Sequence, residues 1–163
     1  MMTEIPYDEE TTRDWDWFAV DDEGNIAHLA TGTFRRLPES VRCDWERAEE
    51  LIAYFEAAPE IGDFAVRAEF WESEKTQGNP TILKNEAERQ RYFRSFAKMA
   101  KRGLYSYDTV LKTPGDYYGV TVPQSPLNIR MLPQEVRERL AKTTASVRFR
   151  ETAQIPEFVT LKW

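Results

Sequence analysis

The sequence predicts an α+β domain with a mainly antiparallel sheet and two longer helices packed on one face of it. Three observations support this prediction. Segments rich in β-branched and aromatic residues come in adjacent pairs separated by turn residues, as in β-hairpins. Two longer segments instead repeat apolar residues at helical spacing. Strands that follow one another directly pair antiparallel, which leaves the helices to cover the sheet.

The first predicted hairpin is WFAVDDEGNIAHLATG, residues 17–32. Because side chains alternate along a strand, we expect Trp17 and Phe18 to face opposite sides, with both sides at least partly covered. The acidic stretch DDEGN between the strands predicts a tight turn, since Gly24 and Asn25 tolerate positive φ. The pattern is explained by folding alone, although the turn could also present charge to a partner.

Two amphipathic helices follow. The first is predicted from about residue 44 to 58, with Asp44 as its N-cap. The second begins at Asn85, which has Glu88 three positions later as in a capping box, and ends at Gly103. Between them, residues 64–71 alternate apolar and polar side chains and predict a half-exposed strand.

The rest of the chain predicts a second hairpin and a shorter tail. Residues 104–111 and 117–122 form the hairpin, with a turn at 113–116, and a short helix starts near Pro133. The segment ASVRFRE, residues 145–151, predicts a last main strand. Residues 1–13 are polar and predict a mobile lead-in, which leaves residues 14–163 as a single domain.

Composition excludes several classes of protein. The 163 residues carry a net charge of −6, so a nucleic acid is a poor candidate partner. The single cysteine rules out a disulfide framework, and no apolar run approaches the roughly 20 residues of a membrane helix. The start of the chain lacks the pattern of a secretory signal, so we expect a protein of the cytoplasm with no membrane partner.

Catalytic and metal-binding patterns are weak. The only histidine, His28, lies in a predicted strand, where a packed or surface role is more common than general base catalysis. Cys43 lies near a helix start and could pair with His28 for thiol chemistry, although a small buried residue explains it better. One His and one Cys cannot supply a structural zinc set, and the acidic turn lacks the spacing of a calcium loop. We expect no metal and no cofactor.

A basic run lies at residues 98–103. Positive charge at the carboxyl end of a helix explains this run better than an anion site does. A nucleic-acid surface would require its extension by Arg89, Arg91 and Arg94, and the flanking acidic residues weaken that interpretation.

Three segments resemble a group of small uncharacterised bacterial proteins. They are DWFAVDDEGNIAHLATG, LPESV and YYGVTVPQSPLNIRMLPQEVRERL, and together they cover most of residues 15–140. In that group a hairpin of the form WFAxDxxGxIAxxxTG opens the chain and an LPxxV helix closes it, and the group is associated with immunity partners of bacterial polymorphic toxins. This chain departs from the pattern at Thr33 and Arg35, where a glycine-rich turn is expected. The resemblance implies an inhibitor and no catalytic residues.

We therefore expect a non-enzymatic protein-binding module, whose acidity would speed capture of a basic toxin domain such as a nuclease. A solvated turn and a solvated strand end explain the same candidate contact residues, which are Asp21, Asp22 and Glu23 in the turn and Glu69, Trp71, Glu72 and Glu74 at the strand end. The alternative is a ligand-binding protein or an enzyme with a dispersed site near His28, drawing on Cys43, Tyr105 or Tyr107.

Overall fold

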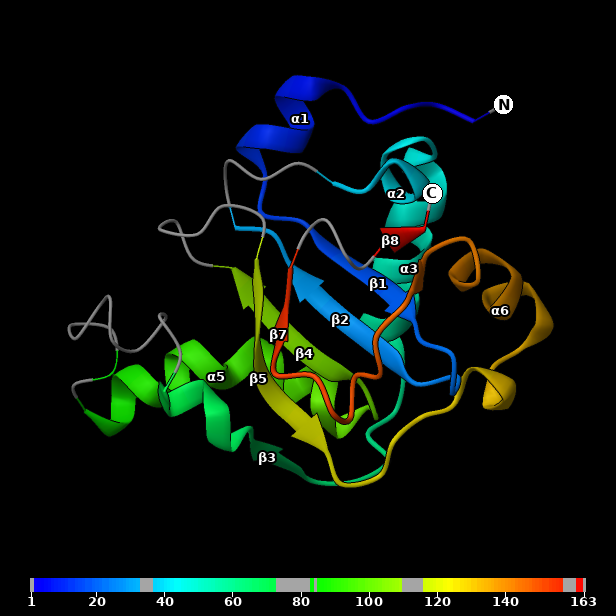
Figure 1. The fold of residues 1–163 in the computed structure, drawn as a ribbon. Helices are drawn as coiled ribbons and strands as arrows, with labels where there is room; N and C mark the ends of the chain where they lie inside the picture. The colour runs from blue at the N-terminus through cyan, green and yellow to red at the C-terminus, as the bar shows by residue number, and fades with distance from the viewer. Residues whose placement is uncertain are drawn as a thin grey trace.

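The computed structural model describes residues 2–32, 37–72, 83, 85–109, 116–156 and 161–162. Within these residues an eight-stranded sheet has the strand order β3-β5-β4-β2-β1-β6-β8, and β7 pairs with β5 (Figure 1). The predicted α+β fold is confirmed. In chain order, with η for a 3-10 helix, the elements are α1 (Tyr7–Thr12), β1 (Asp16–Val20), β2 (Ile26–Ala30), α2 (Glu39–Arg42), α3 (Trp45–Ala57), β3 (Phe64–Val66), η1 (Ala68–Glu72), α5 (Glu86–Lys101), β4 (Tyr105–Thr109), β5 (Tyr117–Pro123), η2 (Ile129–Met131), α6 (Gln134–Leu140), β6 (Thr144–Ala145), β7 (Gln154–Ile155) and β8 (Leu161–Lys162).

Both predicted hairpins form, and the sheet is mixed. Strands β1 and β2 pair antiparallel, with Phe18 opposite His28, and β4 pairs antiparallel with β5. Strands β2 and β4 lie side by side in parallel, because the chain between them crosses over through α3 and α5. The remaining parallel pair is β1 with β6.

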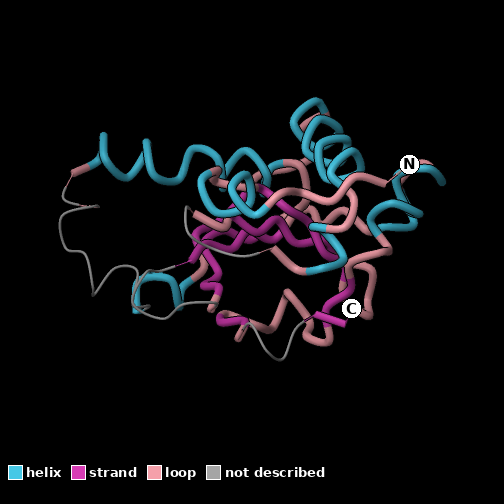
Figure 2. Tube along the Cα trace, turned by 90° about the horizontal axis from the view of Figure 1, so that it is seen from above, coloured by secondary structure: helices cyan, strands magenta, loops and turns pink. Residues whose placement is uncertain are grey.

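The two longer helices cover one face of the sheet, as Figure 2 shows. Each begins at its predicted cap: Asp44 accepts a hydrogen bond from the backbone N–H of Arg47, and Asn85 accepts one from that of Glu88. Leu51 and Phe55 of α3 pack into the same apolar cluster as Phe18. The capping residues and the buried apolar stripes thus support the same two helices that the sequence predicts.

The opposite face is covered mainly by the chain after α6. Trp17 of β1 and Tyr107 of β4 lie in one buried cluster with Phe149 and Ile155 of this segment. In Figure 2 the segment forms a layer on the side of the sheet away from α3 and α5. Trp17 and Phe18 thus belong to different clusters on opposite faces, as their alternation predicts.

Two predicted strands are shorter than expected. In residues 64–71 only β3 is extended, and the chain then turns into η1, which buries Phe70. In residues 145–151 the strand prediction is wrong beyond Ala145. The backbone of Phe149 bonds instead to the side chains of Asp21 and Arg67, so no neighbouring strand satisfies it. The turn predicted at 113–116 lies almost wholly outside the described residues.

The amino-terminal residues carry structure that the prediction of a mobile lead-in missed. Helix α1 lies here, and the backbone N–H of Ile5 donates to the carbonyl of Arg42 over 2.8 Å. Ile5 and Glu10 are buried, and a carboxylate oxygen of Glu10 accepts from the N–H of Leu37 at 2.6 Å. The polar composition of the segment concealed these contacts, because they join it to residues about thirty positions further along the chain.

Candidate functional site

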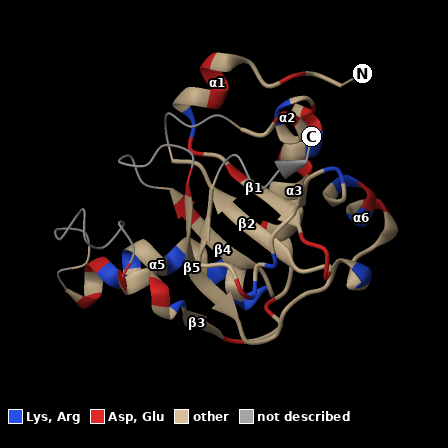
Figure 3. Ribbon diagram, viewed as in Figure 1, with Lys and Arg blue, Asp and Glu red and all other residues tan. Residues whose placement is uncertain are grey.

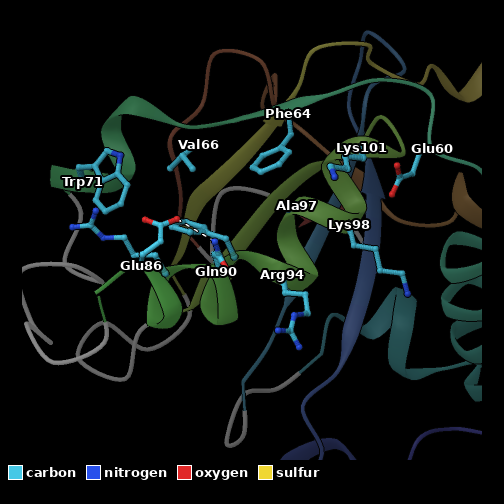
Figure 4. Close-up of a pocket in the computed structure, with 12 residues that line it drawn as sticks. Glu60, Phe64, Val66, Trp71, Glu86, Gln90, Arg94, Ala97, Lys98 and Lys101 are labelled. Atoms are coloured by element: carbon cyan, nitrogen blue, oxygen red, sulfur yellow. Dashed lines mark hydrogen bonds between the residues drawn. The ribbon is translucent and has the colours of Figure 1, made fainter. Parts of the chain in front are cut away.

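A groove of about 590 Å³ lies between α5 and the edge formed by β3 and η1 (Figure 4). Its lining combines aromatic and charged side chains: Glu60, Phe64, Val66, Trp71, Glu86, Arg89, Gln90, Phe93, Arg94, Ala97, Lys98 and Lys101. A hollow of this size lies in the range of ligand-binding sites. We refer to it as the α5 groove.

Local geometry explains why these residues meet. Phe64 and Val66 are two positions apart in β3, so their side chains project from one face of the strand, toward α5 in Figure 4. On the helix, Gln90, Ala97 and Lys101 share one face at spacings of a turn or two. The small side chain of Ala97 leaves room between the helix and the strand. The groove is therefore a consequence of a short edge strand packed beside a long helix.

Trp71 is held at one end of the groove by other rings. Its ring centroid lies 5.4 Å from that of Phe70 and 5.8 Å from that of Phe93, in edge-to-face contact with both. Phe70 is itself buried against Tyr92 of α5, at 5.8 Å between centroids. Trp71 is nevertheless 44% exposed. The protein thus presents a large exposed aromatic side chain that packs against other aromatic rings.

Four basic residues of α5 line the groove. The Arg89 guanidinium lies 5.8 Å from the ring centroid of Trp71, and the Lys101 ammonium lies 5.9 Å from that of Phe64. Arg94 and Lys98 extend from the outer side of the helix in Figure 4. Among the described residues, no carboxylate lies within salt-bridge distance of Arg94, Lys98 or Lys101.

Acidic residues are fewer than basic ones in the described lining of the groove, and one of them accepts a hydrogen bond. The Glu86 carboxylate accepts a hydrogen bond from the Gln90 side chain at 3.3 Å. Among the described residues of the lining, Glu60 is the one further acidic residue, against four basic ones. The described part of the groove lining is consequently positive in a chain whose net charge is −6.

The predicted contact residues of the β1–β2 turn serve the fold more than they serve a surface. Asp21 is only 6% exposed, and its carboxylate accepts from the backbone N–H groups of Glu23, Asn25 and Phe149 at 2.9–3.0 Å. Glu23 pairs with Arg150 at 2.7 Å, and this hydrogen bond holds the pKa of the Glu23 carboxyl below its ordinary value. Of the three acids only Asp22 is exposed.

The second predicted group lies at the α5 groove. Glu69, Trp71 and Glu72 are exposed on η1, and Glu74 lies outside the described residues. The turn packs beside Asn128, which precedes η2, whereas η1 packs against α5. Figures 1 and 3 show these regions on different sides of the molecule, so the structure does not bring the two groups together.

His28 is buried in a hydrogen-bonded row across the sheet. Its Nε2 lies 2.6 Å from a carboxylate oxygen of Asp16, and its Nδ1 lies 3.0 Å from the hydroxyl oxygen of Ser106. Acid, imidazole and hydroxyl thus stand in the order used by serine hydrolases, but with the roles of the two ring nitrogens exchanged. However, His28 is 1% exposed and Ser106 is 0% exposed, with the rings of Phe18 and Phe96 beside the imidazole. A substrate cannot reach this hydroxyl in the structure, so the row is suited to holding β1, β2 and β4 together.

Burial and charge act in opposite directions on the acids near His28. Burial raises the pKa of the Asp16 carboxyl, but the hydrogen bond and charge of His28 outweigh it, and the net pKa is lowered. Burial also raises the pKa of Asp14, and the nearby charge of Asp16 raises it further. Asp16 is therefore the anionic partner in this row.

The remaining candidates of the alternative hypothesis are engaged elsewhere. Cys43 lies 3.7 Å from the carbonyl of Ser40 and makes no contact with His28. Tyr107 is buried, which raises its pKa, and its hydroxyl donates to the carbonyl of Thr152 at 2.7 Å. Burial likewise raises the pKa of Tyr105. These side chains do not converge on a common reacting atom.

The residues that the structure describes contain neither a metal-binding cluster nor a membrane-spanning helix. No cluster of three or more His, Cys, Asp or Glu side chains there could hold a metal ion. No helix in that part of the chain is long and apolar enough to cross a membrane.

Sequence reasoning identified Trp71 but missed the rest of the α5 groove. The basic residues of α5 were assigned to the helix end, and Arg89 and Arg94 were considered only as part of a nucleic-acid surface. A second stripe on the helix, away from the buried one, was the available signal: Gln90, Ala97 and Lys101 share a face that Phe96 and Met99 do not. No local feature of the β3 sequence indicates that this strand packs beside the second stripe of α5.

Comparison of the chain with known proteins finds no matching family model, no matching curated protein and no matching solved structure. The function is therefore argued from the site itself.

Proposed function

We propose that the protein is a binding module that holds another protein at the α5 groove, with Trp71 as the central contact. In line with the resemblance noted in the sequence, the proposed partner is a bacterial toxin, whose active surface this immunity protein masks in the cytoplasm. Catalysis is not part of the proposal.

The observation that carries the proposal is the exposed ring of Trp71, supported from behind by Phe70 and Phe93. A rigid, exposed tryptophan loses little conformational entropy on binding and buries a large apolar area, which is why such residues dominate many protein interfaces. The flanking acids Glu69 and Glu72 fit the polar rim of such an interface.

The alternative of an enzyme near His28 receives less support. A general base or nucleophile must reach the substrate within hydrogen-bond distance. Both His28 and Ser106 are enclosed, while the exposed aromatic surface lies at the α5 groove. The accessible surface chemistry thus favours binding.

The test is co-expression with the product of the gene adjacent to its own, followed by titration calorimetry of the two purified proteins. We expect a stoichiometric complex that Trp71→Ala weakens about 30-fold, because truncating a central interface aromatic costs about 2 kcal/mol. Met131→Ala is the matched control, since Met131 is 66% exposed but lies on η2.

Absence of a complex with that product, in either order of purification, would contradict the toxin proposal. Equal effects of the two substitutions would instead place the contact away from Trp71. Thermal melting of each variant verifies that the comparison is made between folded proteins.

A further inference from the structure

We propose that the α5 groove takes an extended, acidic segment of the protein partner, with one apolar side chain of that segment seated among Phe64, Val66 and Trp71. This inference rests on the proposed binding function and specifies the chemistry of the part that is bound. It differs from the expectation drawn from the sequence, in which acidic residues of this protein contact a basic toxin domain.

The basic residues of α5 are the feature that favours an acidic partner segment. Arg94, Lys98 and Lys101 have no carboxylate within salt-bridge distance among the described residues. Lys101 lies beside the ring of Phe64, and charges on an incoming segment that are partly removed from water there attract more strongly. The charge of Lys98 already helps to lower the pKa of the Asp16 carboxyl, so a partner segment rich in Glu or Asp supplies negative charge chiefly to Arg94 and Lys101.

The four basic residues are spread along the length of α5, although Arg89 and Lys98 project from opposite sides of the helix. From Arg89 to Lys101 the helix rises about 18 Å, at 1.5 Å per residue. An extended chain covers that distance with about five or six residues. A ligand with a single anionic head would meet only one or two of the four cations. Cations spread over this length of the helix therefore fit a linear polyanion better than a small amphiphile.

The edge position of β3 is a further argument. The backbone carbonyl of Asp63 accepts from the N–H of Gln124 at 3.0 Å, and the N–H of Arg67 donates to the carbonyl of Val120 at 2.8 Å. The main-chain groups of the odd-numbered residues therefore bond to β5. Main-chain groups of Phe64 and Val66 consequently point away from β5. Because β3 ends the described strand order, an extended segment could pair with these groups while its side chains enter the groove.

A nucleic acid satisfies the charge argument less well. Its phosphates are uniform, whereas Glu60 and Glu86 interrupt the basic lining and the whole chain carries a charge of −6. An apolar pocket at Val66 and Phe64 also matches an aliphatic or aromatic side chain. The acidic protein segment is the occupant that these features favour.

The test is fluorescence anisotropy with a labelled ten-residue peptide of Glu and Asp residues around one central Phe. We expect saturable binding that weakens as salt is raised. The double variant Arg94→Glu, Lys98→Glu should weaken binding at least tenfold. Its matched control is Arg130→Glu, Arg137→Glu, which makes the same charge change on η2 and α6.

Three other probes give outcomes that decide against the inference: the same peptide with Lys in place of its acids, an oligothymidylate of equal charge, and dodecanoate. Tighter binding of any of these than of the acidic peptide overturns it. So does failure of the acidic peptide to bind, or binding that survives the Arg94 and Lys98 reversals.

Failure of this inference is separable from failure of the proposed function. A complex with the adjacent gene product that Trp71→Ala disrupts, but the double charge reversal leaves intact, contradicts the acidic segment and retains the binding module. Conversely, specific peptide binding without that complex supports the groove chemistry and contradicts the toxin partner.

Discussion

Asp16 and His28 form a contact whose contribution to stability depends on pH. The two side chains meet at 2.6 Å, and His28 is buried while Asp16 reaches partly into solvent. Although burial alone raises the pKa of Asp16, its partner lowers the net pKa below the ordinary value. At pH values around the ordinary pKa of an aspartate, the folded state consequently binds fewer protons than the unfolded state. Stability from Asp16 is then fully present above the unfolded pKa, near 4, and is lost as the pH falls through the folded pKa.

We therefore predict that Asp16→Asn flattens the acid side of the stability profile. The difference in free energy of unfolding between the two proteins should be largest at pH 5 and above and should shrink below about pH 4. Urea unfolding at a series of pH values measures this. Asp22→Asn, a change in the exposed turn, is the control and should leave the profile parallel to that of the parent. A constant offset between parent and Asp16→Asn would show that the carboxylate acts without titrating.

At the scale of elements, the β1–β2 turn shows why a surface pattern and a structural pattern look alike in sequence. The motif DDEGN predicts a turn, and the turn forms between Val20 and Ile26. The same letters also predicted three solvated acids. Asp21 is instead buried, and its carboxylate accepts from the backbone N–H of Phe149, 128 positions away along the chain, a contact that no local rule reveals. Turn chemistry was therefore predictable, but the orientation of its acids was not.

Replacing Asp21 should show this internal role directly. Asp21→Ala removes an acceptor from three backbone N–H groups, including the buried one of Phe149, and we expect a loss of about 2–4 kcal/mol in free energy of unfolding. The neighbouring change Asp22→Ala should stay within about 0.5 kcal/mol. Urea unfolding of both variants checks the prediction, which fails if the two losses are equal.

Helix α5 illustrates the other half of the comparison. Its start at Asn85, its end near Gly103 and its buried stripe were all predicted, because caps and apolar spacing are local features. Its groove-facing side was not predicted, because that side becomes meaningful only when β3 and η1 pack beside it. The candidate site is thus a tertiary feature, and only Trp71 carried a signal of its own.

At the scale of the whole molecule, the sheet is covered in two different ways. The longer helices cover one face through repeated apolar stripes, which sequence periodicity predicts. The other face is covered by a segment with little regular structure, held where Asp21 and Arg67 meet the backbone of Phe149. Alternating apolar residues there predicted a strand, but its hydrogen bonds go to distant side chains. The architecture of the first hundred residues was therefore more predictable than that of the last twenty.

Phe149 attaches the segment after α6 to the sheet, so truncating its side chain tests how much this covering segment contributes to the stability of the whole molecule. The side chain is fully buried beside Tyr107, with 5.9 Å between ring centroids. We predict that Phe149→Ala costs about 3–5 kcal/mol in free energy of unfolding, as expected for a large cavity in a core. Hydrogen exchange should rise more in residues 144–155 than in α3, because Leu51 and Phe55 of the helix pack in the cluster of Phe18 and only Ala48 among its buried residues belongs to the cluster of Phe149. Arg148→Ala, which truncates a half-exposed side chain, should change neither quantity appreciably. Uniform acceleration of exchange across both faces would instead mean that the segment and the sheet unfold as one unit.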